Sequence, residues 1–157
     1  MRTFEVLTAI EEETVEWGHL LGSRVDRAAV ITVEGVLGAG KTQLVKGIAL
    51  GLGIDNEISS PTYTICVPYS GRMRMLHVDA YRLKYEREVD DLGLDEAVNE
   101  GAVVIVEWPD GIEHCLPPAD LKITITILDQ TRRRICFSGE SELGVKWADA
   151  LQNARKI

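Results

Sequence analysis

The sequence predicts an α/β fold of three layers, with helices on both faces of a mixed, mainly parallel central sheet. Two mainly apolar, β-branched runs, 28–33 (AAVITV) and 103–107 (VVIVE), have the pattern of strands that are buried on both faces. Segments with helical periodicity lie between the predicted strands, an order that favours helices packed on a parallel sheet. Two further pairs of strands are joined by short turns, which adds antiparallel hairpins to the parallel centre.

Length and composition indicate one domain over residues 1–157. The chain has 157 residues, 45% of them hydrophobic, and can bury enough surface to fold without disulfides or a structural metal. Its three cysteines lack zinc-ligand spacing. No secretion signal and no run of ~18 apolar residues is visible, so we expect a cytoplasmic protein without membrane contact. The net charge of −8 argues against unspecific binding of nucleic acid by the isolated chain.

The N-terminal third is expected to hold a helix, a strand and a second helix. Thr8 and Glu11 have the spacing of a capping box, and apolar residues then recur on one helical face, which predicts a helix over 9–25. The apolar run 28–33 is the next strand. A second helix, marked by apolar residues between 44 and 52, ends at a glycine, Gly53.

Later in the chain, alternating or apolar runs bounded by turn residues predict two hairpins, another buried strand and a last helix. These elements are expected at 63–69 and 74–79, at 103–107, at 123–127 and 134–137, and at 141–154. The first hairpin turns at Ser70–Gly71 and the second at 129–132.

The strongest motif is 35–42 (GVLGAGKT), which matches G-x-x-x-x-G-K-[ST] without a mismatch between a predicted strand and a predicted helix. Glycines let the backbone curl so that successive N–H groups face inward. These donors and the positive end of the following helix form a site for a polyphosphate. In such a loop, Lys41 reaches the β and γ phosphates of a nucleotide, and the Thr42 hydroxyl binds the Mg²⁺ that bridges them.

A phosphate-binding loop of this kind needs a carboxylate at the end of a neighbouring strand. Asp79 and Glu107 both follow apolar strand segments, so both should emerge at the edge of the sheet where α/β proteins bind ligands. We assign Glu107 to the metal and Asp79 to the attacking water or to the outer ligands of the metal. The alternative is that each acid only marks the place where a strand meets solvent.

A switch segment is predicted at 60–63 (SPTY), between the second helix and the first hairpin. The hydroxyls of Ser60 and Thr62 could meet the γ phosphate or its water. The alternative is an ordinary loop that enters a strand.

These motifs together resemble the bacterial TsaE (YjeE) family of small P-loop ATPases. The resemblance covers almost the whole chain and rests on five segments in order: GVLGAGKT (35–42), SPTY (60–63), HVDAYRL (77–83), DLGL (91–94) and EWP (107–109). It implies a P-loop NTPase-like fold and an ATPase that is weak alone and stimulated by partners. It also implies that the protein acts with a TsaB–TsaD heterodimer to make N6-threonylcarbamoyladenosine (t6A) in tRNA, and meets tRNA only through this complex.

The resemblance also implies roles for individual residues. Catalytic roles fall to Lys41, Asp79 and Glu107, and the metal site to Thr42 and Glu107. The implied nucleotide neighbours are Glu11, Gly38, Ala39, Gly40, Lys41, Thr42, Gln43 and Arg132. Trp108, with Tyr81 and Arg82, would shape the pocket or a partner surface, with packing at the sheet edge as the alternative for the tryptophan.

The chain departs from the family inside the loop. The family usually has an acidic residue at the position of Val36 and often a threonine at that of Gln43. A role for an acidic group at position 36 is therefore not expected, whereas Gln43 still offers its backbone N–H to a phosphate.

Charge is distributed unevenly along the chain. The segment 86–100 has seven acids and one arginine, which indicates a solvated acidic helix, or alternatively a face that docks a basic partner. Positive charge gathers at 132–134 and at Arg72 and Arg74.

Two other functions remain open from the sequence. Small-molecule kinases use the same loop motif, although no arginine-rich lid is evident here. A nucleotide-dependent switch without enzymatic activity is the other alternative. The guanine-reading NKxD and the transporter signature LSGGQ are both missing from the sequence.

Overall fold

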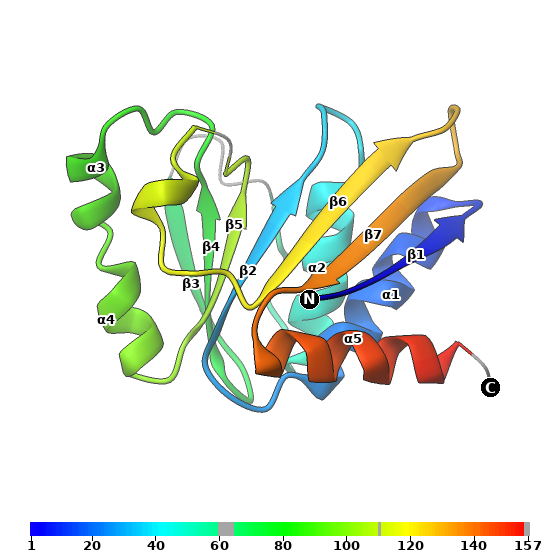
Figure 1. Ribbon diagram of the computed structural model, residues 1–157, viewed down its shortest axis with the longest axis horizontal. Helices are drawn as coiled ribbons and strands as arrows, with labels where there is room; N and C mark the ends of the chain where they lie inside the picture. The colour runs from blue at the N-terminus through cyan, green and yellow to red at the C-terminus, as the bar shows by residue number, and fades with distance from the viewer. Residues whose placement is uncertain (60–64, 110, 156–157) are drawn as a thin grey trace.

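The computed structural model describes residues 1–59, 65–109 and 111–155, and within these ranges seven strands form one sheet in the order β1-β7-β6-β2-β5-β4-β3 (Figure 1). The strands are β1 (Arg2–Thr8), β2 (Ala29–Glu34), β3 (Cys66–Ser70), β4 (Arg74–Asp79), β5 (Val103–Glu107), β6 (Leu121–Ile127) and β7 (Arg133–Gly139). The helices are α1 (Glu11–Arg24), α2 (Lys41–Gly51), α3 (Glu86–Asp90), α4 (Leu94–Asn99) and α5 (Glu142–Ala154), with a 3₁₀ turn, η1 (Glu113–Cys115).

The centre of the sheet is parallel, as predicted. Strand β2 lies between β5 and β6 and runs parallel to both, and β4 runs parallel to β5. The two predicted hairpins, β3–β4 and β6–β7, are antiparallel, and β1 adds a third antiparallel pairing with β7. The unbroken apolar runs of β2 and β5 follow from this position, because both faces of these strands are buried.

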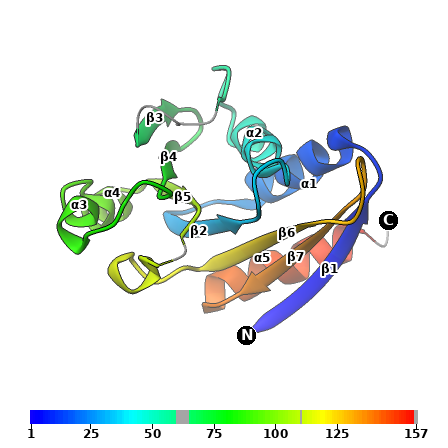
Figure 2. The ribbon, with the colours of Figure 1, turned by 90° about the horizontal axis from the view of Figure 1, so that it is seen from above.

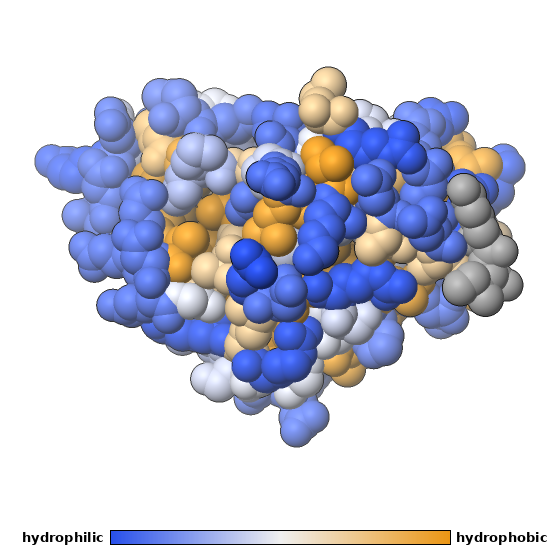
Figure 3. Space-filling view, turned by 60° about the horizontal axis from the view of Figure 1, so that its bottom comes forward, coloured by the Kyte–Doolittle hydropathy of each residue, from blue (hydrophilic) through white to orange (hydrophobic). Residues whose placement is uncertain are grey.

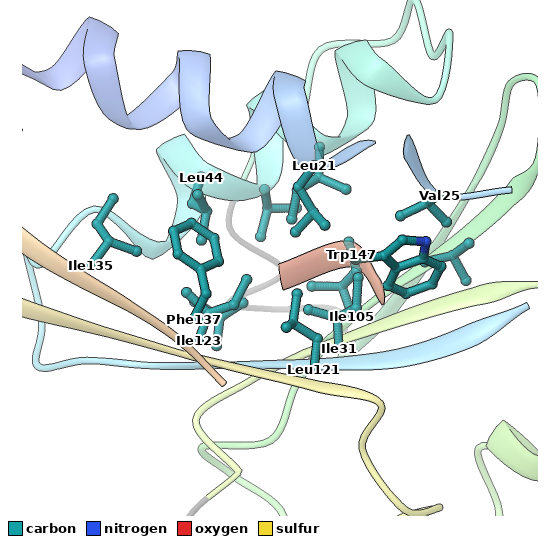
Figure 4. Packing of buried hydrophobic residues seen from close by; sticks show 14 of the residues in the cluster. Leu21, Val25, Ile31, Leu44, Ile105, Leu121, Ile123, Ile135, Phe137 and Trp147 are labelled. Carbon is teal, nitrogen blue, oxygen red and sulfur yellow. The ribbon is translucent and has the colours of Figure 1, made fainter. Parts of the chain in front are cut away.

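Helices cover both faces of the sheet, which confirms the α/β layer arrangement. On one face, α1, α2 and α5 share a continuous apolar core with the strands, as Figure 4 shows. Its members include Leu21, Leu44 and Trp147 from the helices and Ile31, Leu121 and Ile123 from the sheet. On the other face, a smaller cluster joins α3 and α4 to the central strands, with Val89, Leu94, Val104 and Val106 among its members.

Glycines form the contact between α1 and α2, which lie side by side (Figure 2). Gly18 and Gly22 of α1 face Gly47 and Gly51 of α2. A Cβ atom on Gly18 would lie 2.2 Å from the carbonyl oxygen of Leu44, and one on Gly22 would lie 2.1 Å from that of Ile48. The two backbones therefore touch directly, which fixes the start of α2 relative to α1.

Arg72, in the turn of the first hairpin, ties the far ends of the same two helices together. Its guanidinium donates to the carbonyl oxygen of Gly22 in the last turn of α1 (2.8 Å) and to that of Val25 directly after this helix (2.7 Å). It also donates to the carbonyl oxygen of Gly51 at the end of α2 (3.2 Å). A cation at two helix C-termini satisfies carbonyl groups that have no partner within the helices and complements both helix dipoles.

The surface away from the carboxyl ends of the parallel strands is mainly hydrophilic. Figure 3 shows its apolar side chains in small, separate groups among polar ones. None of the helices in the described part of the chain combines the length and the apolar character needed to cross a bilayer.

The N-terminus differs from the prediction. Residues 2–8 form an edge strand that was not predicted, and Thr8 is its last residue instead of a helix cap. Phe4, Val6 and Thr8 alternate with exposed residues, which is the pattern of a strand with one buried face. Helix α1 begins only at Glu11, and the residue before it, Ile10, makes no side-chain cap.

The acidic segment also differs from the prediction of one solvated helix. It forms two short helices, α3 and α4, separated by Gly93 in the left-handed conformation (φ 65°). Its apolar residues are buried against the sheet while its acids face outward. Strand β3 begins at Cys66 instead of residue 63, and residues 63 and 64 of the predicted strand lie outside the described residues.

Candidate functional site

The loop between β2 and α2 forms a backbone cradle at the carboxyl edge of the parallel strands (Figure 1). Gly38 (φ 82°) and Gly40 (φ 106°) adopt the left-handed conformation, which a residue with a Cβ atom rarely takes. Because α2 begins at Lys41, the first N–H groups of the helix have no acceptor within it. These donors and the positive end of the α2 dipole favour an anion at this position.

Lys41 is held inside this loop. Its side chain is buried, with 5% exposed, and its Nζ donates to the carbonyl oxygens of Gly35 (2.5 Å) and Val36 (3.1 Å). Burial lowers the pKa of Lys41, while the negative charges of Glu107 and Asp79 act in the opposite direction. Among the described residues, the ammonium thus donates hydrogen bonds only to neutral carbonyl oxygens. Hydrogen bonds to charged phosphate oxygens would be stronger.

Trp108 covers the ammonium of Lys41. The Nζ atom lies 3.6 Å from the centroid of the Trp108 ring, in the geometry of a cation–π contact. The edge of the same ring system meets Tyr81, with 5.3 Å between centroids. Trp108 has φ 58°, the one positive value at a residue other than glycine in the described chain, and such strain is often found at functional sites.

The two predicted acids lie side by side at the ends of β4 and β5. Asp79 and Glu107 are register partners in the parallel pair, so both side chains project from the same face of the sheet. Glu107 is buried, with 2% exposed, and its carboxylate hydrogen-bonds to the Nε2 atom of the buried His77. Asp79 accepts a hydrogen bond from the backbone N–H of Tyr81 at 2.9 Å.

His77 was not expected at the site. It lies two residues before Asp79 on the same strand, so the alternation of β4 places both on one face. Its Nδ1 atom is buried and has no hydrogen-bond partner among the described residues. One carboxylate oxygen of Glu107 is therefore held by a neighbour inside the protein, while the residue also lines the adjoining cavity.

A cavity of about 660 Å³ joins these groups to the N-terminus of α1 and to the turn of the second hairpin. Of the nucleotide neighbours implied by the sequence, the described lining contains Glu11, Gly38, Ala39, Gly40, Lys41, Thr42 and Gln43. Glu107 and Trp108 also line it, and Asp79 lies beside Glu107 outside the lining. The predicted switch residues Ser60 and Thr62 lie outside the described residues.

Arg132 is placed differently from the expectation. It is exposed, and its Nε atom forms an ion pair with Asp129 at 2.5 Å within the hairpin turn. Hydrogen bonds from the backbone and side chain of Arg132, with one from the N–H of Thr131, lower the pKa of Asp129 to about 2. The arginine that lines the cavity is Arg133.

Several lining residues were not predicted from the sequence. Apart from Leu37, which belongs to the predicted loop itself, they are Ile10, Glu12, Thr14, Gln130, Thr131 and Arg133. These six come from the N-terminal segment, the hairpin turn and the start of β7, which meet the loop only in the folded chain. The signal that could have found Arg133 is the alternation of β7, in which residue 133 shares a face with the buried Ile135 and Phe137.

The oxygen ligands at the loop suit Mg²⁺ that arrives with a phosphate. In the described ranges, no group of three or more His, Cys, Asp or Glu residues could hold a metal alone. Thr42 and Glu107 supply a hydroxyl and a carboxylate to the cavity. Magnesium sites typically combine one or two such protein ligands with phosphate oxygens and water, so this small donor set fits the ion.

Comparison with known proteins gives one consistent family. The family model described as "Threonylcarbamoyl adenosine biosynthesis protein TsaE" matches residues 8–135. The tRNA threonylcarbamoyladenosine biosynthesis protein TsaE of Bacillus subtilis is 40% identical over 139 residues, which cover 88% of this chain and 87% of the relative. The protein of the same name from Treponema pallidum is 38% identical over 124 residues, covering 79% of this chain and 92% of the relative.

The fold comparison agrees with the sequence comparisons. The crystal structure of YdiB from Bacillus subtilis superposes with a TM-score of 0.85 at 32% sequence identity. The superposition covers 98% of this chain and 97% of that chain, so the similarity includes the sheet, both helix layers and the loop.

Proposed function

The chain belongs to the TsaE family of tRNA threonylcarbamoyladenosine biosynthesis, and from this premise we propose that it binds and hydrolyses ATP as a component of the t6A machinery. We further propose that it does so in the cytoplasm, together with TsaB and TsaD. The observation that carries the proposal is the meeting of Lys41, Thr42 and Glu107 in one cavity at the carboxyl edge of the sheet.

ATP binding would begin with an exchange of partners at Lys41. The ammonium leaves the carbonyl oxygens of Gly35 and Val36, or shares them, and binds phosphate oxygens instead. The N–H groups at the start of α2 bind the same phosphates. The remaining part of the cavity, between the start of α1 and the hairpin turn, has room for the nucleoside, and its total volume is typical of small-molecule sites.

Magnesium, when bound, neutralises phosphate charge and would be held by the Thr42 hydroxyl and the Glu107 carboxylate. The contact with His77 restricts the Glu107 side chain to one orientation. A preoriented carboxylate loses less conformational entropy when it becomes a ligand.

Hydrolysis would then need a water molecule in line with the terminal phosphate. The water oxygen forms a bond to the γ phosphorus while the bond from that phosphorus to the β–γ bridging oxygen breaks. ADP leaves with the electron pair of this bond, and the proton of the water passes to a carboxylate, for which Asp79 beside Glu107 is the candidate. Lys41 counters the negative charge that develops on the phosphate oxygens.

The proposal is tested by measuring ATP affinity and phosphate release for the wild-type protein and three variants. These are Lys41→Ala, Glu107→Gln and the control Lys46→Ala. Loss of the ammonium should weaken ATP binding about 10- to 100-fold, because charged hydrogen bonds to phosphate are lost. Glu107→Gln should keep nucleotide bound but slow cleavage about 100-fold or more. Lys46 lies on the same helix outside the described cavity lining, so Lys46→Ala should behave as wild type. Wild-type turnover in both site variants would reject the site.

The same variants separate the alternatives once TsaB, TsaD and tRNA are added. We expect the partners to raise phosphate release, and we expect Glu107→Gln to support t6A formation for about one cycle only. Sustained modification with a variant that binds but does not cleave ATP would instead favour a nucleotide switch. Transfer of labelled phosphate to a metabolite, without release of inorganic phosphate, would favour a kinase.

A further inference from the structure

The guanidinium of Arg133 connects the hairpin turn to the phosphate-binding loop. Its Nε donates to the carbonyl oxygen of Ala39 at 3.0 Å, and its Nη2 donates to that of Gly38 at 3.2 Å. Its Nη1 donates to the carbonyl oxygens of Asp129 (2.7 Å) and Arg132 (2.9 Å) in the turn. One planar cation therefore binds four backbone carbonyl groups from two segments that are far apart in the sequence.

The backbone of Arg133 is fixed from both sides. It is the first residue of β7 and pairs with Thr8 of β1 and with Ile127 of β6. Its side chain leaves the sheet on the face that carries α2. The side chain of the next residue, Arg134, projects from the opposite face, where its Nε atom lies 3.8 Å from the Oε2 atom of Glu5. The sheet thus aims one arginine at the loop.

Holding these carbonyl groups determines where the loop points its N–H groups. In a trans peptide the C=O and N–H bonds point in opposite directions, and the described chain contains no cis peptide. Because Arg133 holds the carbonyl group of Ala39, the N–H group of Gly40 in the same peptide points the opposite way, away from Arg133. Without Arg133, the loop would be free to sample other shapes, because Gly38 and Gly40 are glycines and can adopt many backbone conformations. Fixing such a loop on binding would then cost conformational entropy.

We propose that Arg133 is a positioning residue that holds the loop in its anion-binding shape before a nucleotide arrives. It acts on the polyphosphate through the backbone of Gly38 and Ala39, without binding the phosphates itself. It also couples the phosphate end of the cavity to the hairpin turn, whose Gln130 and Thr131 line the other end. This inference rests on the proposed nucleotide site.

Binding of ATP, ADP and adenosine to Arg133→Ala, Arg133→Lys and Arg134→Ala, measured by calorimetry, tests the proposal. Arg133→Ala should weaken ATP and ADP about tenfold or more, because two charged hydrogen bonds that shape the loop are lost. Adenosine should bind within about twofold of wild type. Arg133→Lys should be intermediate, since an ammonium cannot hold both carbonyl groups in a fixed fork. Arg134→Ala removes the same charge one residue away and should bind all three ligands as wild type.

Hydrogen exchange of the ligand-free variants gives a second readout that does not depend on binding. The amides of residues 38–41 should exchange faster in Arg133→Ala and Arg133→Lys than in wild type and Arg134→Ala, while the amides of β2 stay protected. If Arg133→Ala does not fold, Arg133→Lys carries the same comparison.

Three results would overturn the inference. Unchanged ATP affinity and loop exchange in both Arg133 variants would show that the loop keeps its shape alone. An equal loss for adenosine and ATP would make Arg133 a nucleoside contact, and loss of ATP affinity with unchanged loop exchange would make it a direct phosphate ligand. Failure of the proposed function is distinct from all three, because then the wild-type protein itself would not bind ATP.

Discussion

At the scale of single residues, Lys41 combines burial with a charge that the site requires. In the ligand-free protein, burial makes the ammonium unfavourable and lowers its pKa, and the two nearby carboxylates offset this only in part. The protein thus keeps a buried charge that costs stability when no ligand is bound, a trade-off that is common at functional sites.

Lys41→Met is expected to raise the unfolding temperature of the ligand-free protein at pH 7 by about 1–3 °C, while it weakens ATP binding as Lys41→Ala does. Since the pKa of Lys41 is lower in the folded protein than in the unfolded chain, the unfolded chain binds the proton more tightly. Between the lowered pKa and 10.5, the folded protein has already lost this proton while the unfolded chain still holds it, so the free energy of unfolding of wild type should rise with pH. The stability advantage of Lys41→Met over wild type should therefore shrink across this pH range. Chemical denaturation between pH 7 and 10.5, with Lys46→Met as control, measures it. An advantage that grows with pH would contradict the explanation.

The residue scale also shows what the sequence could and could not predict about the site. The motif and a strand end predicted Lys41, Thr42 and Glu107, which the structure brings together in the lining of one cavity, because these signals are local. Asp79 lies beside Glu107 outside the lining. Among three consecutive arginines, however, the family resemblance pointed to Arg132, whereas the alternation of β7 places Arg133 on the face of Ile135 and Phe137. That Arg133 also lies next to the loop depends on the pairing of β7 with β1 and β6, which are distant in the sequence.

At the scale of elements, the contact between α1 and α2 controls where the loop begins. Each of the four glycines faces backbone atoms of the other helix, so no side chain separates the two axes. A Cβ atom on Gly47 would lie 2.1 Å from the carbonyl oxygen of Val15, far inside contact distance. Because α2 starts at Lys41, a shift of this helix also moves the N–H groups at its start, which we propose to bind phosphate.

Gly47→Ala is therefore expected to destabilise the protein by about 2–3 kcal/mol, the cost of overpacking a rigid contact, despite the better helix propensity of alanine. Urea denaturation gives the free energy of unfolding. Glu16→Ala, at an exposed position of α1, is the matched control and should change it by less than about 0.5 kcal/mol. A Gly47→Ala protein as stable as wild type would mean that the helices can separate without loss.

At the scale of the whole molecule, the cavity is assembled from four separate parts of the chain. These are the start of α1, the loop before α2, the end of β5 and the turn between β6 and β7. A nucleotide that touched all four would connect β5 and the β6–β7 turn with the starts of α1 and α2. Ligand binding should therefore stabilise the entire fold, and not only the loop.

ADP with Mg²⁺ at about 100 times its dissociation constant should stabilise the protein by about 2.7 kcal/mol, which corresponds to a rise of about 5–10 °C in unfolding temperature. Thermal unfolding followed by circular dichroism measures this shift. Lys41→Ala should lose most of it at the same ADP concentration, and Lys46→Ala should retain it. An equal shift in the Lys41→Ala protein would place the nucleotide elsewhere.

The fold as a whole was more predictable than its borders. The buried runs of β2 and β5 and the two hairpins determined the α/β class, because strong patterns survive without tertiary information. Strand β1 was missed because Thr8 and Glu11 also fit a helix cap, and only pairing with β7 decides between the two. The segment 86–100 was expected to form one solvated helix because most of its residues are charged. Its few apolar residues, which pack against the sheet, gave too weak a pattern to show two buried faces.

The glycine contact between α1 and α2 also restricts how such a protein can evolve. When two side chains clash, a smaller residue at the second position can restore the fit, so substitutions can be exchanged in pairs. Here the obstacle to any side chain at Gly18, Gly22, Gly47 or Gly51 is the partner's main chain, which every amino acid shares. No second mutation among neighbouring side chains can make room for a Cβ atom at these positions. Each of the four glycines should therefore be retained during evolution, even where the residues around it are substituted.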